Sequence, residues 1–177
     1  AHVMPTRSEL GTRTIFNILG PLTNPASAPN TLMGVFHPDL VGIQARVMKQ
    51  LGADHVLVVH GRDGMDEVTT TGPTYVCELA DDTVRSFEIT PADAGLPEAR
   101  IEDLKGGTPA ENARALREVI SGAKNAYRDI VLFNAAASLI VAGKVTGLKD
   151  GVAMAAQSID SGAAADRLEK LVAASNG

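Results

Sequence analysis

The segment ADHVLVVHG, at residues 53–61, most constrains how this chain can fold. It is a continuous apolar run rather than an alternating one, which is typical of a strand covered on both faces. A shorter apolar run, TLMGVF, lies at residues 31–36, and the segment between the two runs has apolar residues at helical spacing. Strand, helix and strand in this order predict a right-handed crossover that joins two parallel strands.

The helix expected in this crossover begins near Asp39 and ends at Gly52. Its apolar stripe comprises four residues at helical spacing: Leu40, Ile43, Val47 and Leu51. The sequence therefore predicts that this stripe faces the core.

Downstream, PTYVCELA and TVRSFEIT are separated by Asp-Asp, which predicts an antiparallel hairpin. A helix is expected from Thr108, because Pro109 suits a first turn and Glu111 completes a capping box. Residues 127–143 form either one long helix or a strand that enters a helix, and two further helices are expected at 148–160 and 163–174. We therefore expect an α/β domain with a mostly parallel sheet flanked by helices and an antiparallel hairpin.

Composition excludes several classes of protein. The formal net charge is −5 and the basic residues are scattered, so nucleic acid is not an expected partner. Cys77 is the single cysteine, which excludes an internal disulfide framework and predicts a buried thiol. No apolar run reaches the ~18 residues of a membrane helix and no signal peptide is visible, so we expect a soluble, cytoplasmic protein without a membrane partner.

The stretch RTIFNILGPLTNP, at residues 13–25, contains two proline-ended dipeptides, Gly20-Pro21 and Asn24-Pro25. Proline fixes its own φ and disfavours the helical conformation in the residue before it, so Gly20 and Asn24 are expected outside a helix. The segment is either a rigid connection between a helix and a strand or a loop whose backbone lines a pocket.

Asp66 and Glu67 follow the apolar run at 53–61, at the carboxyl end of the expected strand, where open α/β sheets bind ligands. Adjacent carboxylates could hold Mg²⁺, which takes one or two carboxylates together with substrate phosphates. The alternative is a solvated acidic turn. His37, His55 and His60 do not have the spacing of a metal site.

Three other features have a functional and a structural interpretation. Arg7 is either a surface residue or a bidentate partner for a carboxylate near the Gly-Pro loop. Gly106 and Gly107 precede a helix and are either loop residues or part of an anion site. In FNAAASL the small residues suit close packing, with Asn134 placed for a polar contact.

Five segments occur in an order that resembles the anthranilate phosphoribosyltransferase family over essentially the whole chain. They are RSELGTRTIFNILGPLTNPA, VVHGRDGMDE, LKGGTPAENA, FNAAASLIVAGK and AAQSIDSGAAADRLEKL. The first two are the specific ones. The resemblance implies a Mg²⁺-dependent enzyme of tryptophan biosynthesis that transfers a phosphoribosyl group from phosphoribosyl pyrophosphate to anthranilate. It also implies the catalytic-domain fold shared with nucleoside phosphorylases, and a homodimer.

The resemblance implies roles for five residues of this sequence. Arg7 would contact the anthranilate carboxylate, and Gly20 and Pro21 would line the channel for this acid. Asp66 and Glu67 would bind the second Mg²⁺, which bridges to the pyrophosphate. The resemblance implies no general base, and the catalytic residues are left unassigned.

The family's glycine-rich pyrophosphate loop, Gly-Thr-Gly-Gly-Asp, and its Lys-His-Gly-Asn segment do not occur in this sequence. Residues 1–177 therefore resemble the C-terminal part of the enzyme, a single incomplete domain with one of two Mg²⁺ sites partly present. We expect this chain alone to be inactive. Three alternatives stay open: a nucleoside phosphorylase-like enzyme, a phosphoribosyltransferase for another acceptor, and a non-catalytic α/β fragment or binding module.

Overall fold

The structure is a computed structural model that describes residues 9, 11 and 15–176. Within these residues the chain forms six α-helices, four strands and two short 3-10 helices. The first half contains α2 (Phe16–Leu22), β1 (Asn30–Gly34), α3 (Asp39–Gln50), β2 (His55–Gly61), β3 (Thr74–Ala80) and β4 (Thr83–Ile89). After 3-10 helices at Pro91–Ala94 and Ile101–Leu104 come α4 (Pro109–Ile120), α5 (Ala126–Val141), α6 (Leu148–Asp160) and α7 (Ala163–Asn176).

The four described strands form one sheet in the order β1-β2-β3-β4. The crossover through α3 makes β1 and β2 parallel, as expected, with Asn30 opposite His55 and Gly34 opposite Val59. The predicted hairpin of β3 and β4 is also confirmed. Its turn residues, Asp81 and Asp82, have φ values of 48° and 58°, the left-handed region that two-residue hairpin loops require.

The α/β class is confirmed, but the described sheet is mixed rather than mostly parallel. Strand β3 runs antiparallel to β2, and β4 antiparallel to β3, so one of the three pairings is parallel. Parallel neighbours need a crossover, usually a helix, and the segment at 62–73 that joins β2 to β3 contains none.

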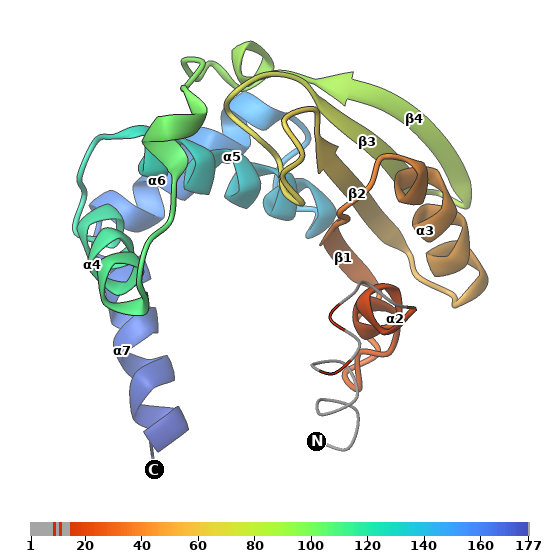
Figure 1. Cartoon of the computed structure of the whole chain (residues 1–177), viewed down its shortest axis with the longest axis horizontal. Helices are drawn as coiled ribbons and strands as arrows, with labels where there is room; N and C mark the ends of the chain where they lie inside the picture. The colour runs from red at the N-terminus through yellow and green to blue at the C-terminus, as the bar shows by residue number, and fades with distance from the viewer. Residues whose placement is uncertain (1–8, 10, 12–14, 177) are drawn as a thin grey trace.

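Helices cover both faces of the sheet (Figure 1). Helix α3 packs on one face, where Cys77 is buried as expected. Helix α5 packs on the other, where Phe133 is fully buried between α5 and the sheet. Burying one such side chain stabilises the fold by roughly 1.5–3 kcal/mol. Because both faces of β2 are covered, six of its seven residues are buried.

The predicted helix α3 is present, but the predicted buried face is wrong. Ile43 and Leu51 are 46% and 59% exposed, and Leu40 and Val47 are half-buried. The buried stripe is instead Val41, Gln44, Ala45 and Met48. The buried face therefore includes a small residue, Ala45, and a polar one, Gln44. The positions of the apolar residues alone do not predict such a face.

The later helices form a second layer that extends away from the sheet along α5 and α6 (Figure 1). Residues 126–141 are a single helix, which settles the alternative left open by the sequence. At the crossing of α5 and α6, a Cβ added to Gly151 would lie 2.7 Å from the Cβ of Ala136, so the two helices pack with almost no side chain between them. No helix in the described part of the chain is long and apolar enough to cross a membrane.

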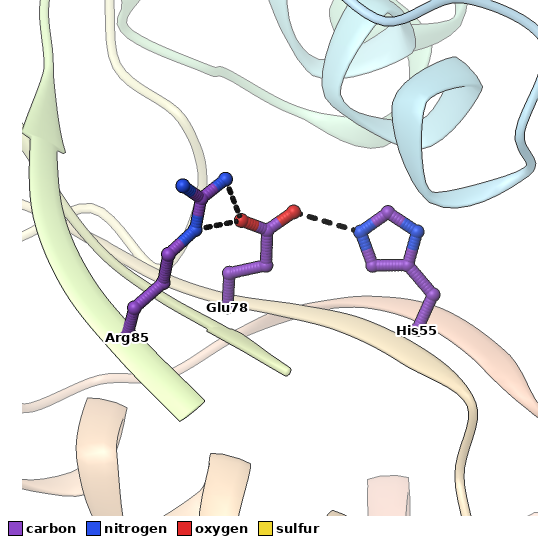
Figure 2. Close-up of polar contacts among 3 residues, drawn as sticks. All are labelled: His55, Glu78 and Arg85. Carbon is purple, nitrogen blue, oxygen red and sulfur yellow. Dashed lines mark hydrogen bonds and ion pairs between the residues drawn. The ribbon is translucent and has the colours of Figure 1, made fainter. Parts of the chain in front are cut away.

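A polar cluster crosses three strands at the end of the sheet where β2 begins (Figure 2). Glu78 is 5% exposed, and its Oε1 lies 2.9 Å from Nε2 of His55. Its Oε2 accepts a hydrogen bond from Nε of Arg85 at 2.7 Å and forms an ion pair with Nη2 of Arg85 at 2.6 Å. His55 is the first residue of β2, whereas Asp66 lies beyond the last residue of that strand. The cluster therefore supports the sheet and lies apart from the acidic pair.

Candidate functional site

The candidate site forms where β1 and β2 end side by side. The parallel pairing places Gly34, the last residue of β1, opposite Val59 near the end of β2. The acidic pair, Asp66 and Glu67, follows in the connection at 62–73. This is the carboxyl edge of the parallel pair, the position expected for a ligand site.

Asp66 and Glu67 are both exposed, and no described Lys or Arg forms an ion pair with either. Partial desolvation raises the pKa of Glu67, and the negative charges of Asp66 and Asp63 raise it further. The described residues contain no cluster of three or more His, Cys, Asp or Glu side chains that could enclose a metal. Among the described residues, the pair is therefore an open anionic site whose charge no ion pair compensates.

Asp63 differs from the pair because its carboxylate is engaged within the loop. Its Oδ2 accepts hydrogen bonds from the hydroxyls of Thr69, at 2.5 Å, and Thr71, and its Oδ1 accepts one from the Met65 backbone at 2.9 Å. Partial burial acts to raise the pKa of Asp63, but these hydrogen bonds outweigh it and lower the pKa. Asp63 therefore stays ionised and ties the loop together.

The Gly-Pro stretch lines a groove of about 480 Å³, which we call the loop groove. It is lined by Gly20, Pro21, Thr23, Asn24, Pro25, Thr31, Leu32, Met33 and Gly34. The segment is also a rigid connection from α2 to β1. The Oδ1 of Asn24 accepts a hydrogen bond from the Ala26 backbone at 2.9 Å, and the Asn24 carbonyl accepts one from the Ser27 backbone at 3.0 Å. The stretch is therefore both a rigid connection and part of the lining of a groove.

One detail of the expected loop is wrong. Gly20 lies inside α2, together with Pro21, whereas Asn24 lies outside a helix as expected. Glycine has no Cβ to clash with the following proline ring, and Pro21 cannot donate an intrahelical hydrogen bond, so α2 ends one residue later, at Leu22.

Gly34 connects the loop groove to the acidic pair. A Cβ added at Gly34 would lie 1.6 Å from the backbone carbonyl oxygen of Asp66. The backbone of Asp66 therefore rests on Gly34, which also lines the loop groove. Gly20, Pro21, Asp66 and Glu67, which are far apart in sequence, thus belong to one edge of the molecule.

The other candidates have different outcomes. Arg7 lies outside the described residues. The N-terminus of α4 is closed by the chain itself, because Glu111 accepts a hydrogen bond from the Thr108 backbone at 2.7 Å and Asn112 accepts one from Gly107 at 2.8 Å. The anion interpretation of the two glycines therefore has no support, and the predicted capping box is confirmed.

Sequence reasoning did not identify Asp63 or Gly34. A glycine inside an apolar strand pattern is a signal of close backbone approach, so TLMGVF contained a clue for Gly34. The role of Asp63 depends on hydroxyls that reach it only after the loop folds back. His60 is buried, and its Nδ1 donates a hydrogen bond to the Val35 carbonyl oxygen at 2.7 Å.

Comparison with known proteins supports the resemblance. Residues 1–165 match the family described as "Glycosyl transferase family, a/b domain". The curated anthranilate phosphoribosyltransferase of Rhodospirillum rubrum is 60% identical over 172 residues, covering 97% of this chain and 50% of that protein. The one from Rhizobium rhizogenes is 61% identical over 175 residues, covering 99% and 52%. The chain thus spans about half the length of the curated relatives it matches.

Solved structures show the same similarity. Anthranilate phosphoribosyltransferase from Thermus thermophilus superimposes with a TM-score of 0.87 at 43% identity, covering 97% of this chain and 51% of that one. The Saccharomyces cerevisiae enzyme in complex with phosphoribosyl pyrophosphate and Mg gives 0.85 at 33% identity, covering 95% and 49%. The predicted catalytic-domain fold is confirmed. By its sequence, its fold and the order of its motifs, the chain belongs to the glycosyl transferase family, a/b domain.

Proposed function

We propose that this chain forms the acceptor-binding and metal-binding part of an anthranilate phosphoribosyltransferase. The reaction transfers the phosphoribosyl group of phosphoribosyl pyrophosphate to anthranilate and releases pyrophosphate. One observation carries the proposal: the loop groove and the Asp66–Glu67 pair meet at Gly34. An acceptor in the groove would lie beside a metal-bound leaving group, and such positioning lowers the barrier to transfer.

The acidic pair fits Mg²⁺. Two exposed carboxylates with uncompensated charge, one with a raised pKa, gain from a divalent cation. Mg²⁺ commonly uses one or two carboxylates and completes its shell with water and substrate phosphates, so an open site suffices. When bound, the ion supplies positive charge that stabilises the leaving pyrophosphate. The relatives solved with Mg support this assignment.

The residues of this chain have positioning roles in the proposal. Gly20 and Pro21 form the wall of the groove that holds the aromatic acid. Arg7, by resemblance, holds its carboxylate and so aims the amine at C1 of the ribose. The aniline nitrogen is already an uncharged nucleophile, so the proposal requires no strong general base.

A chimera tests the function. The matching 172 residues of the Rhodospirillum rubrum enzyme are replaced by this chain, and loss of anthranilate is followed with phosphoribosyl pyrophosphate and Mg²⁺ present. We expect turnover, and we expect the paired change Asp66→Asn and Glu67→Gln to raise the half-saturating Mg²⁺ concentration at least about tenfold. Unchanged Mg²⁺ dependence in that variant would refute the metal assignment. An Arg7→Ala chimera with an unchanged KM for anthranilate would refute the role of Arg7.

The same assay separates the alternatives. Turnover of a pyrimidine nucleoside with phosphate, without turnover of anthranilate, would favour a nucleoside phosphorylase. For residues 1–177 alone we expect no turnover, because the sequence has no Gly-Thr-Gly-Gly-Asp loop to hold pyrophosphate. The homodimer is likewise part of the proposal, and the mass of the chimera in solution tests it.

A further inference from the structure

Asn134 holds the segment that follows the acidic pair. It lies in the middle of α5 and is half-buried. Its Oδ1 accepts a hydrogen bond from the Val68 backbone N–H at 2.9 Å, and its Nδ2 donates to the Val68 carbonyl at 2.7 Å. Nδ2 also donates to the Ile130 carbonyl of its own helix at 2.9 Å. One amide thus satisfies both backbone groups of a residue 66 positions away.

Val68 directly follows Glu67, and its side chain is fully buried in the core beneath α5. A buried backbone group must find a partner, and in a strand that partner would be a neighbouring strand. At Val68 the partner is a side chain on a helix. In Figure 1 the yellow connection between β2 and β3 accordingly lies beside α5.

The other side of the acidic pair is also held. Asp63 binds Thr69, Thr71 and the Met65 backbone, so it closes the loop on itself. That closure fixes the shape of the loop but does not connect it to another element. Asn134 supplies a hydrogen-bonded connection to a helix that packs against the sheet, next to the residue that follows the acidic pair.

We propose that Asn134 is a positioning residue for the Asp66–Glu67 pair. It touches neither substrate nor metal. It anchors Val68, and thereby fixes the direction from which the Glu67 carboxylate reaches the cation. This inference rests on the proposed function, which places Mg²⁺ at the pair. Ligating carboxylates depend on such supporting hydrogen bonds, and their loss commonly weakens metal binding.

The test uses the 177-residue chain and Mn²⁺ as the probe. Mn²⁺ is titrated while paramagnetic broadening of backbone amide NMR signals is followed at residues 66–68, and amide exchange is measured at Val68. In Asn134→Ala we expect faster exchange at Val68 and a half-saturating Mn²⁺ concentration raised several-fold, up to about tenfold. If this variant does not fold, Asn134→Ser is measured in its place. The serine side chain is too short to bond both backbone groups of Val68, so the same two changes are expected.

Two variants separate positioning from loss of stability. Ser138→Ala, one turn along α5, removes a hydroxyl whose one hydrogen bond to a described residue is to the Asn134 backbone carbonyl, at 2.9 Å. Val119→Ala weakens the separate core formed by α4, α5 and α6. Neither should alter Mn²⁺ binding. An Mn²⁺ affinity reduced equally in Val119→Ala and Asn134→Ala would overturn the positioning role.

The result also distinguishes this inference from the proposed function. Broadening at residues 66–68 in the wild type that persists at the same Mn²⁺ concentration in Asn134→Ala would overturn the inference alone. Wild-type chain that shows no broadening there would overturn the metal assignment, and the inference with it.

Discussion

At position 34 the absence of a side chain determines where Asp66 lies. A Cβ at Gly34 would overlap a backbone oxygen, which cannot rotate away as a side chain could. Gly34→Ala should therefore displace the loop and lower the free energy of unfolding by about 1–3 kcal/mol, the usual cost of overpacking. Urea unfolding measures the loss. Gly42→Ala is the matched control, because its Cβ would meet only the movable end of Arg46, and equal stability of the two variants would contradict the argument.

The contacts of Glu78 predict how much this residue contributes to stability. It is buried and accepts a hydrogen bond from Arg85 while contacting His55 (Figure 2). Glu78→Ala should lower the free energy of unfolding by about 1–2 kcal/mol. This is less than the loss of a fully buried ion pair would cost, because the Arg85 side chain is 70% exposed and can be hydrated by water once Glu78 is removed. Thermal unfolding measures it. Glu88→Ala, which breaks an exposed pair with Arg62, should cost less, and a reversed order would contradict the assignment.

At the scale of elements, the capping box of α4 predicts a pH dependence. The Thr108 backbone N–H and hydroxyl both donate to Glu111 and lower its pKa from the ordinary 4.5. A lowered pKa means that ionised Glu111 stabilises the fold above the ordinary value, and that this stabilisation is lost as pH falls through the folded-state pKa. The stability difference between the wild type and Glu111→Ala should therefore be largest near neutral pH and shrink in acid. Unfolding at a series of pH values tests this, and a constant difference would contradict it.

The elements also show what sequence can and cannot predict. The apolar periods and the turn residues predicted nearly every strand and helix, because local chemistry fixes them. The face of α3 was not predictable from its apolar residues, because Gln44 and Ala45 are buried there by close packing on the sheet. For the candidate site, Gly20, Pro21, Asp66 and Glu67 are predictions that follow from motifs. The polar contact expected at Asn134 is confirmed, but its partner, like that of Gly34, is known only once distant segments meet, whereas Asp63 acts within its own loop.

At the scale of the whole molecule, stability should be uneven. Helix α7 has no buried residue, and it extends from the end of α6 away from the sheet (Figure 1). Leu171 and Val172 are 65% and 52% exposed. Few buried apolar contacts predict local opening well below the global free energy of unfolding. Amide hydrogen exchange should therefore be faster along residues 167–176 than in α5. Equal protection of the two helices would instead show that α7 unfolds only when the whole molecule unfolds.

The contact between Gly34 and Asp66 limits how the specificity of this site can be redesigned. Under the proposed function, a groove for a bulkier acceptor could be widened at Thr31, whose side chain lines the groove. Gly34 has no side chain that could be shortened, and any larger residue at this position would displace the Asp66 backbone. Under the proposed function, selection for a new acceptor and selection for metal binding would therefore both act on position 34, and we expect it to stay glycine in variants that accept different aromatic acids.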